Sequence, residues 1–501
     1  MRISEELHKA RMTEKTEERF IAHEERPAFH LTPRIGWMND PNGFSWYKGE
    51  YHLFYQYYPY DTAWGPMHWG HAVSKDLMHW ENRPCALAPD SFPDREGGCF
   101  SGGAVELPDG RHLLMYTGCR REKHLDGTVC DVQTQNLAVG DGMDYQKYEG
   151  NPVLTELDIP AGASRIDFRD PKIWREKDGS WRCVVANRAE DQTGQLLLFT
   201  SADAFHWSYK SALSVNHGRF GKMWECPDYF EMDGCSVILI SPQDMEPDDA
   251  GFHAGNNVLC MIGSFSEEDG RFKEQYVQPV DDGIDFYATQ TVLAPDGRRI
   301  LLGWMQSWDT VPYRKENTRW FGQVTIPREL TIRDGHLYQN PVREVEQYRG
   351  DKIEKDRIQV DDDHSLVCPE LAGRTLDLTL KIRAAEDCRR VALRFAEGGK
   401  HYCEVLYRPE EGTLTIDRSH SGVSRDVLHS RTVRLKTIGK ELKLRLILDR
   451  YSAEIFVNDG ESAMTMTYYS DLAERGISVH ANGTAEIDLT GYRIEIGETG
   501  R

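Results

Sequence analysis

Between residues 30 and 335 the chain consists largely of short apolar runs separated by Gly, Asp, Pro and Asn. Runs of four or five apolar residues bounded by turn-forming residues predict β-strands joined by tight turns, with few helices between them. Examples are Tyr51–Tyr55, His112–Tyr116, Leu196–Phe199 and Val237–Ile240.

An internal repeat divides this region into units. Ser74–Trp80 and Ser201–Trp207 share the pattern Ser-x-Asp-x-x-His-Trp, which predicts a hydrogen-bonded turn leading into a buried aromatic side chain; looser copies occur at 141–148 and 268–272. The aromatic positions 80, 148, 207 and 272 are 68, 59 and 65 residues apart. Such a step holds four short strands, which is one propeller blade, and the region is long enough for five.

After about Arg349 the pattern changes. Arg374–Lys381 and Leu442–Leu446 alternate apolar and charged residues, which is typical of strands with one buried and one exposed face. Turn signals such as Asn458-Asp459-Gly460 separate them at short intervals. We therefore predict an all-β chain: a five-bladed β-propeller over 30–340, then an antiparallel β-sandwich over 355–501, with the linker inside 335–355.

Size, charge and cysteine content narrow the class of protein. A chain of 501 residues exceeds one hydrophobic core, and its net charge of -21 excludes nucleic acid as a partner. Residues 1–29 are expected to form a charged, solvated, partly helical arm with Ile3, Leu7 and Ala10 on one stripe. Neither a signal peptide nor a membrane span is expected. Eleven cysteines without Cys-x-x-Cys pairs suit free thiols in the cytoplasm.

His68 and His71 stand three residues apart and could be interpreted as a ligand pair. Their segment is predicted to lead into a strand rather than to form a helix, so we favour packing over metal binding. No metal or cofactor is expected.

Three acidic motifs carry the candidate chemistry: Asn39-Asp40-Pro41, Arg169-Asp170-Pro171 and Glu225-Cys226-Pro227. Taken singly, an Asp before Pro is most often a turn residue. Together, each motif presents a carboxylate at the end of an apolar strand, and converging carboxylates are what the hydrolysis of a glycosidic bond requires. Three carboxylates in one site repel, so at least one pKa must rise, which suits a general acid.

The motifs follow the spacing of the blades. Asp40, Ser101, Asp170, Glu225 and Asp285 are separated by 61, 69, 55 and 60 residues. If each occupies the innermost strand of its blade, all five side chains point into one central funnel.

The first motif lies within Trp37-Met38-Asn39-Asp40-Pro41-Asn42-Gly43. With the other two motifs in order, the chain resembles glycoside hydrolase family 32, the group of invertases, inulinases, levanases and sucrose-6-phosphate hydrolases. The resemblance runs from about His30 to Tyr348, with a weaker match at Ala453–Gly460. It implies that Asp40 is the nucleophile, Glu225 the general acid and then base, and Asp170 the stabiliser of the transition state.

The resemblance also implies contacts with the fructosyl ring. One departure is Phe100-Ser101-Gly102-Gly103, where many members have Phe-Ser-Gly-Ser, so one minor hydroxyl contact is lost. Asp285 and Trp304 each have two interpretations, Asp285 as a site or structural residue and Trp304 as a wall of the leaving-group side or a core indole. The predicted substrate-binding residues are Asn39, Gln56, Trp64, Phe100, Ser101, Arg169 and Trp304.

These observations predict an intracellular retaining β-fructofuranosidase acting on a small sugar: sucrose, sucrose 6-phosphate or a short fructo-oligosaccharide. Candidate cations for a phosphate are Arg188, Lys222, Arg314 and Lys315. Two alternatives stay open, a fructosyltransferase and a fructoside-binding propeller without catalysis. A role of the sandwich in a homodimer is also left open.

Overall fold

The structure, a computed structural model, describes residues 3–123, 126–248, 251–436 and 441–497. Nearly all regular structure within these ranges is β-sheet, as the sequence predicts. The one α-helix they contain is α1 (Glu5–Glu17), followed by short 3-10 turns η1 (Glu18–Phe20) and η2 (His23–Glu25). None of the helices in these ranges is long and apolar enough to cross a membrane.

Five sheets follow one another along residues 36–341, and each is built from antiparallel strands that are consecutive or nearly consecutive in sequence, except that the first sheet also takes in the distant strand β19. The four apolar runs singled out above all lie inside strands, which confirms that interpretation. The first sheet contains β1 (Gly36–Tyr47), β2 (Glu50–Tyr58), β3 (His68–Ser74), β4 (Glu81–Leu87) and β19 (Trp320–Phe321); the second β5 (Glu96–Glu106), β6 (His112–Lys123), β7 (Val129–Gly140) and β8 (Tyr145–Lys147); the third β9 (Phe168–Arg175), β10 (Trp181–Arg188), β11 (Gly194–Ser201) and β12 (Trp207–Val215); the fourth β13 (Trp224–Met232), β14 (Cys235–Pro242), β15 (Leu259–Ser266) and β16 (Arg271–Pro279); the fifth β17 (Tyr287–Leu293), β18 (Arg299–Trp304), β20 (Arg328–Arg333) and β21 (His336–Pro341).

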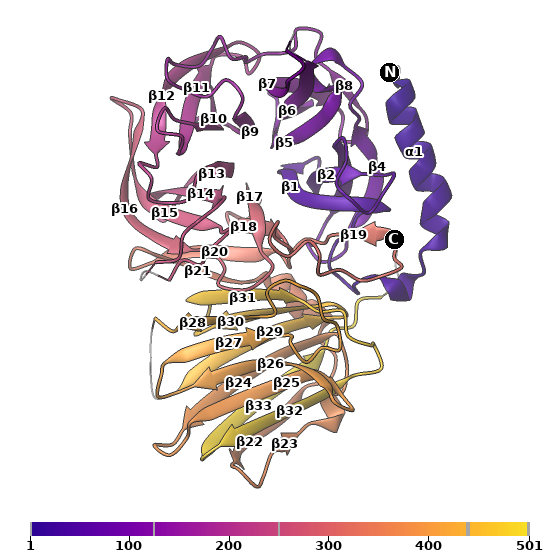
Figure 1. Cartoon of the computed structure of the whole chain (residues 1–501), viewed down its shortest axis with the longest axis vertical. Helices are drawn as coiled ribbons and strands as arrows, with labels where there is room; N and C mark the ends of the chain where they lie inside the picture. Colours follow the sequence, from indigo (N-terminus) through magenta and orange to yellow (C-terminus); the bar gives the residue numbers. More distant parts are fainter. Residues whose placement is uncertain (1–2, 124–125, 249–250, 437–440, 498–501) are drawn as a thin grey trace.

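The first strands of the five sheets meet at the centre of this region (Figure 1). They contact one another in a closed order: β1, β5, β9, β13, β17 and back to β1. The short strand β19, from the last part of the region, pairs in parallel with β1. Residues far apart in sequence are therefore brought together wherever they occupy the same end of these five strands.

In each of the five sheets, the pairing of the first strand with the second contains a β-bulge. The register shifts between Met38 and Pro41 in β1, between Phe100 and Gly102 in β5, and at equivalent places in β9, β13 and β17. A bulge bends its strand and re-aims the side chain at that point. Asp170 and Cys226 have φ values of 63° and 47°, so the acidic motifs coincide with irregular backbone.

The repeated Ser-x-Asp-x-x-His-Trp motif forms the same turn twice, which confirms its interpretation. Asp76 accepts hydrogen bonds from the backbone N–H of Met78 (3.0 Å) and His79 (2.7 Å), between β3 and β4. Asp203 does the same for Phe205 (2.8 Å) and His206 (2.9 Å), between β11 and β12. The motif therefore marks the turn into the fourth strand of a sheet.

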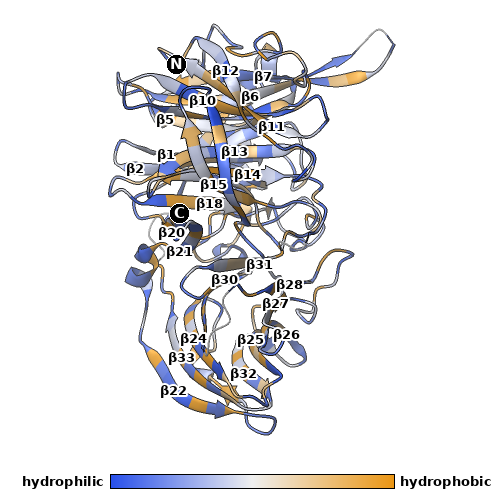
Figure 2. Cartoon of the chain, turned by 90° about the vertical axis from the view of Figure 1, so that its left-hand side faces the viewer, coloured by the Kyte–Doolittle hydropathy of each residue, from blue (hydrophilic) through white to orange (hydrophobic). Residues whose placement is uncertain are grey.

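Residues beyond 341 form two six-stranded sheets below the five-sheet region, after the 3-10 segment η4 (Arg343–Tyr348), which falls inside the expected linker (Figure 1). Buried residues of both sheets share one apolar core. Figure 2 shows apolar segments along the strands of both sheets. One sheet has the order β22 (Ile353–Val360), β33 (Ala485–Arg493), β24 (Leu376–Ala384), β29 (Leu442–Asp449), β30 (Ser452–Val457), β31 (Ser462–Thr467); the other β23 (Leu366–Val367), β32 (Gly476–Asn482), β25 (Arg390–Gly398), β26 (His401–Arg408), β27 (Thr413–Asp417), β28 (Ser430–Arg434); short 3-10 turns η3 (Phe92–Asp94) and η5 (Pro369–Leu371) complete the list.

Buried ion pairs join the two groups of sheets. Arg328 of β20 contacts Asp281 (2.9 Å) and Glu454 of β30 (2.6 Å), and all three side chains are fully buried. His30 lies between Asp449 (2.8 Å) and Glu454 (3.0 Å). Burial alone would lower the pKa of His30, but the hydrogen bonds with the two carboxylates raise it to about 9.

The N-terminal segment is partly helical, as predicted, but it is not a simply solvated arm. Leu7, Ala10 and Glu14 of α1 are buried against the first sheet, whereas Ile3 is exposed. Glu14 accepts a hydrogen bond from the backbone N–H of Cys85 (3.1 Å), and burial raises its pKa to about 7. The helix therefore covers the edge of β4, which would otherwise expose unpaired backbone groups.

Candidate active site

The three acids of the sequence motifs line one pocket of about 460 Å³. Asp40 comes from β1, Asp170 from β9 and Glu225 from β13, so three different sheets contribute. The lining residues are Asn39, Asp40, Gln56, Trp64, Phe100, Ser101, Asp131, Gln133, Ile166, Asp167, Arg169, Asp170, Glu225, Gln243 and Trp308.

Asp40 is fixed by three donors. Its Oδ1 accepts from Asn39 Nδ2 (2.9 Å), and its Oδ2 accepts from Ser101 Oγ (2.8 Å) and Cys226 Sγ (3.6 Å). Burial and the nearby charge of Glu225 raise the pKa of Asp40 to about 6, although the three hydrogen bonds oppose the shift. The carboxylate is thus oriented into the pocket and titrates near neutrality.

Asp170 accepts a hydrogen bond from the same cysteine. The backbone N–H of Cys226 donates to Asp170 Oδ2 at 2.9 Å, and Cys226 Sγ lies 3.8 Å from that oxygen. Burial raises the pKa of Asp170 to about 7; the charge of Arg169 opposes this shift, and that of Glu225 adds to it. Cys226 therefore lies between two acids, and is not merely an apolar neighbour of Glu225.

Glu225 has a different set of partners on each oxygen. Arg169 donates to Oε1 through Nε (3.1 Å) and Nη2 (3.0 Å). Gln243 Nε2 (2.9 Å) and the Tyr287 hydroxyl (2.8 Å) lie against Oε2. Four donor groups therefore hold this carboxyl group in one orientation.

Of the other predicted binding residues, Asn39, Gln56, Trp64, Phe100, Ser101 and Arg169 all line the pocket. Trp37 Nε1 donates to Asn39 Oδ1 (2.7 Å), which orients the Asn39 amide toward Asp40. The Trp64 and Phe100 rings meet edge to face with centroids 6.2 Å apart. Trp64 is 41% exposed, so it offers an aromatic surface at the mouth.

The structure supports the structural interpretation of both Trp304 and Asp285, so Trp304 is removed from the predicted substrate-binding residues. Trp304 does not reach the pocket: it is fully buried and packs against Trp37 and Trp308, and Trp308 lines the pocket in its place. Asp285 does not point into the centre either, because it forms a buried ion pair with Arg418 of the C-terminal sheets. Its motif reaches the pocket only through Tyr287, which contacts Glu225.

Sequence reasoning also missed Gln243, Tyr287, Asp131, Gln133, Asp167 and Trp308 as residues in or behind the wall. Gln243 follows the end of β14, which runs antiparallel to β13 and so ends beside Glu225. A rule that inspects the residue after the second strand of each unit would have found it. Trp308 could have been found as the second Trp in the segment that begins with Trp304.

None of the cations suggested for a phosphate lines this pocket. Arg188 pairs with Asp167 (3.3 Å) and Lys222 with Asp244 (3.6 Å). Arg314 and Lys315 line another pocket together with Thr62 and Arg425.

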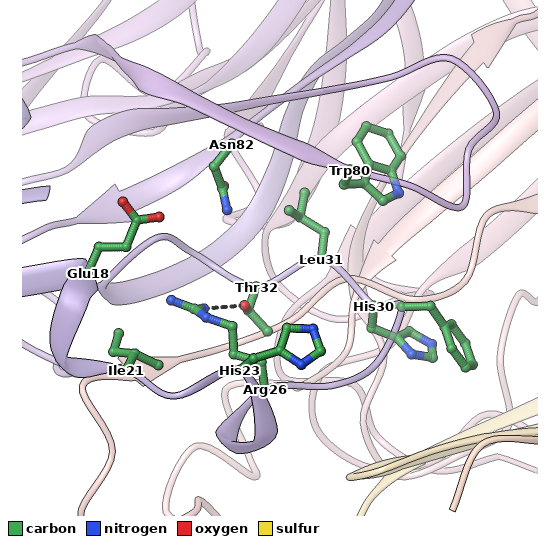
Figure 3. Close-up of a pocket in the computed structure, with 10 residues that line it drawn as sticks. Glu18, Ile21, His23, Arg26, His30, Leu31, Thr32, Trp80 and Asn82 are labelled. Carbon is green, nitrogen blue, oxygen red and sulfur yellow. Dashed lines mark hydrogen bonds between the residues drawn. The ribbon is translucent and has the colours of Figure 1, made fainter. Parts of the chain in front are cut away.

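Two further features lie outside the acidic pocket. A cavity of about 260 Å³ is lined by the N-terminal segment, Trp80 and Asn82, and there Arg26 donates to Thr32 (Figure 3). His68 contacts the Pro66 carbonyl and His71 contacts His52, so each has a packing partner. Among the residues that the structure describes, no cluster of three or more His, Cys, Asp or Glu could hold a metal ion.

Buried carboxyl groups whose pKa values are raised, beside an aromatic surface and a guanidinium, provide the acid–base and charge-stabilising groups of a glycosidase. Comparison with known proteins gives the same class. Residues 30–341 match the glycosyl hydrolases family 32 N-terminal domain, and residues 344–494 match the family 32 C terminal domain. The chain therefore belongs to glycosyl hydrolase family 32.

Individual relatives cover nearly the whole chain. Raffinose invertase from Escherichia coli is 38% identical and aligns with 91% of this chain and 92% of its own length. Sucrose-6-phosphate hydrolase from the same species is 35% identical and aligns with 94% of this chain and 95% of its own length. Among solved structures, a Bombyx mori GH32 beta-fructofuranosidase superposes with a TM-score of 0.82 at 35% identity, covering 97% of this chain and 98% of that one.

Proposed function

We propose that this chain is a retaining β-fructofuranosidase that releases terminal fructosyl units from sucrose or short fructo-oligosaccharides. The observation that carries the proposal is the convergence of Asp40, Asp170 and Glu225 on one pocket from three sheets. In this mechanism Asp40 attacks the anomeric carbon, and Glu225 first protonates the leaving oxygen and then activates water. Asp170 stabilises the positive charge that develops on the sugar ring.

The domain organisation is part of the proposal. The closed order of contacts between β1, β5, β9, β13 and β17 supports five blades of a propeller over 30–340. The two six-stranded sheets with a shared core support a β-sandwich over 355–501. Free thiols such as those of the buried Cys85, Cys99 and Cys183 support a reducing compartment such as the cytoplasm.

Replacement of the two central acids tests the mechanism. Asp40→Asn and Glu225→Gln should each lower kcat on sucrose by about 10²–10⁴-fold or more, because each removes a group that acts on the reacting atoms. Glu225→Gln should keep more activity on a fructoside with a good leaving group, since that substrate needs little protonation. Asp178→Asn, in the exposed turn after β9, is the control. Binding of fructosides without turnover, in the unaltered protein and in both variants alike, would leave only a fructoside-binding role.

Analysis of the reaction products can separate hydrolysis from transfer. At high sucrose concentration a hydrolase releases glucose and fructose in nearly equal amounts. Growth of fructo-oligosaccharides that outpaces fructose release would instead favour the fructosyltransferase.

The charges of the pocket favour an uncharged substrate over sucrose 6-phosphate. Of the described residues that line it, five carry carboxyl groups and one, Arg169, carries a cation, which is already paired with Asp167 and Glu225. A bound phosphate needs donors that are not already engaged. We expect kcat/KM on sucrose to exceed that on sucrose 6-phosphate by about tenfold or more, a ratio that corresponds to 1.4 kcal/mol. The opposite ratio, measured with one preparation, would contradict this substrate assignment.

A further inference from the structure

The two oxygens of Glu225 cannot exchange roles. Among the described residues, the hydrogen-bond partners of Oε1 are the Nε and Nη2 groups of Arg169, and a guanidinium has donors but no acceptor. A proton on Oε1 would point at two other hydrogens. The proton that the acid must deliver therefore belongs on Oε2, where the neighbours are Gln243 Nε2 and the Tyr287 hydroxyl.

The Tyr287 hydroxyl has two partners and can satisfy them in either direction. It lies 2.8 Å from Glu225 Oε2 and 2.9 Å from the carbonyl oxygen of Ser241. A hydroxyl carries one hydrogen and two lone pairs. When Glu225 is ionised, Tyr287 donates to Oε2; when Oε2 is protonated, Tyr287 accepts from it and donates to Ser241. Both patterns fit the same heavy-atom positions.

The surroundings keep Tyr287 in this place and in this form. The side chain is fully buried, and burial raises the pKa of its phenol well above the ordinary value, so the group stays a neutral O–H. The backbone N–H of Ala288 donates to Ser241 Oγ (3.1 Å), which ties the two partners together. Just upstream, the N–H of Ile284 donates to the Thr465 carbonyl (2.7 Å) and anchors the segment to β31.

We propose that Tyr287 is a positioning residue that keeps the proton of the acid on Oε2 and provides a hydrogen-bond partner for Glu225 in both protonation states. The inference rests on the proposed role of Glu225 as acid and base. It explains how one fixed carboxyl group serves two half-reactions with opposite proton requirements. The same hydroxyl accepts before the leaving group is protonated and donates before water is activated.

Tyr287→Phe tests this role, with Tyr47→Phe as the control, because Tyr47 is also buried and donates to a backbone carbonyl, that of Gly110. On sucrose, kcat should fall by about 10- to 100-fold, part of the usual contribution of acid–base catalysis. A fructoside with a good leaving group needs no acid, and azide in place of water needs no base. Together these two changes should restore most of the rate.

Several results would overturn the inference. One is a Tyr287→Phe rate equal to that of Tyr47→Phe; another is a loss that neither the leaving group nor azide repairs, which would indicate structural damage only. Failure of the proposed function is a separate result, because Glu225→Gln would then keep its activity on sucrose.

A measurement on the unaltered protein avoids any effect of substitution on folding. Neutron diffraction at low pH should place a deuteron on Glu225 Oε2 and the Tyr287 deuteron toward Ser241. At high pH the Tyr287 deuteron should point toward Oε2. A deuteron on Oε1, or a Tyr287 hydroxyl that keeps one direction at both pH values, would refute the proposal.

Discussion

At the scale of single residues, burial and hydrogen bonds have opposite effects on the pKa of Asp40. Burial and the charge of Glu225 raise its pKa to about 6, while donors from Asn39, Ser101 and Cys226 restrain that rise. In the proposed mechanism Asp40 must be ionised to attack. Activity should therefore rise as the pH increases through the pKa of this group.

Ser101→Ala tests that balance. Loss of the Ser101 Oγ donor removes a bond that favours the ionised form, so the pKa of Asp40 rises further. The acid limb of kcat/KM against pH should move upward by about one unit, since a hydrogen bond to a charged group contributes about 1.5–3 kcal/mol. Ser45→Ala, a buried serine elsewhere on β1 that donates to the Gly43 carbonyl, should leave the limb in place. A limb that stays put in both variants would show that Ser101 does not control Asp40.

Local motifs in the sequence were sufficient to predict that Asp40, Asp170 and Glu225 share one pocket, because each motif lies on the first strand of its sheet. They were not sufficient for Asp285 and Trp304. Both are fully buried, Asp285 against an arginine 133 residues later. Nothing in the local pattern of either segment reports such burial, so spacing for Asp285 and the resemblance for Trp304 left a pocket position open beside a structural one.

At the scale of elements, the two Asp-centred turns have the same internal hydrogen bonds but different surroundings. Asp76 also accepts from the hydroxyl of Tyr348, at the end of η4, and its side chain is 28% exposed. Within the described residues, Asp203 accepts hydrogen bonds only from residues of its own turn, and its side chain is 50% exposed. The first turn therefore also anchors the linker to the five-sheet region.

Asp76→Ala should accordingly destabilise the protein more than Asp203→Ala. Loss of the turn itself should cost about 1 kcal/mol in each variant, as for a helix-capping Asp. Loss of the Tyr348 contact should add about 1–2 kcal/mol in the first variant only. Urea denaturation of the two variants side by side gives the comparison. Equal shifts of the midpoint would show that Tyr348 contributes nothing.

The strand pattern was predictable at this scale because apolar runs and turn residues are local. The five bulges were not, since a register shift depends on the partner strand as well as on the bulged one. The burial of α1 was missed for a related reason: its charged residues Arg11 and Glu14 satisfy backbone groups of Cys85, so they tolerate a packed face.

At the scale of the whole molecule, charged pairs are buried where the two groups of sheets meet. The pKa of His30 is raised to about 9 from an ordinary value of 6.5, so its contribution to stability is complete below pH 6.5. That contribution is lost as the pH rises through about 9. Neutral His30 would leave Asp449 and Glu454 without a charged partner on that side.

His30→Gln should reveal this linkage. At pH 6 the variant should be less stable than the unaltered protein by about 3–5 kcal/mol, because one member of a buried charge network is missing. At pH 10 the difference should be smaller by about 2–3 kcal/mol, since both proteins then lack the charge. Urea midpoints at the two pH values measure it, and His206→Gln, on an exposed turn, is the control. A constant difference would mean that His30 is not charged in the folded protein.

The contact between Asp285 and Arg418 has a consequence for hybrid enzymes. Because Asp285 lies two positions before Tyr287, the C-terminal sheets fix the chain that leads to the residue in contact with Glu225. Chimaeras that join the five-sheet region of one homologue to the C-terminal sheets of another should keep their turnover only when matching partners for residues 285, 328 and 30 are transplanted together. The C-terminal sheets are therefore needed for catalysis and cannot be exchanged independently of the five-sheet region.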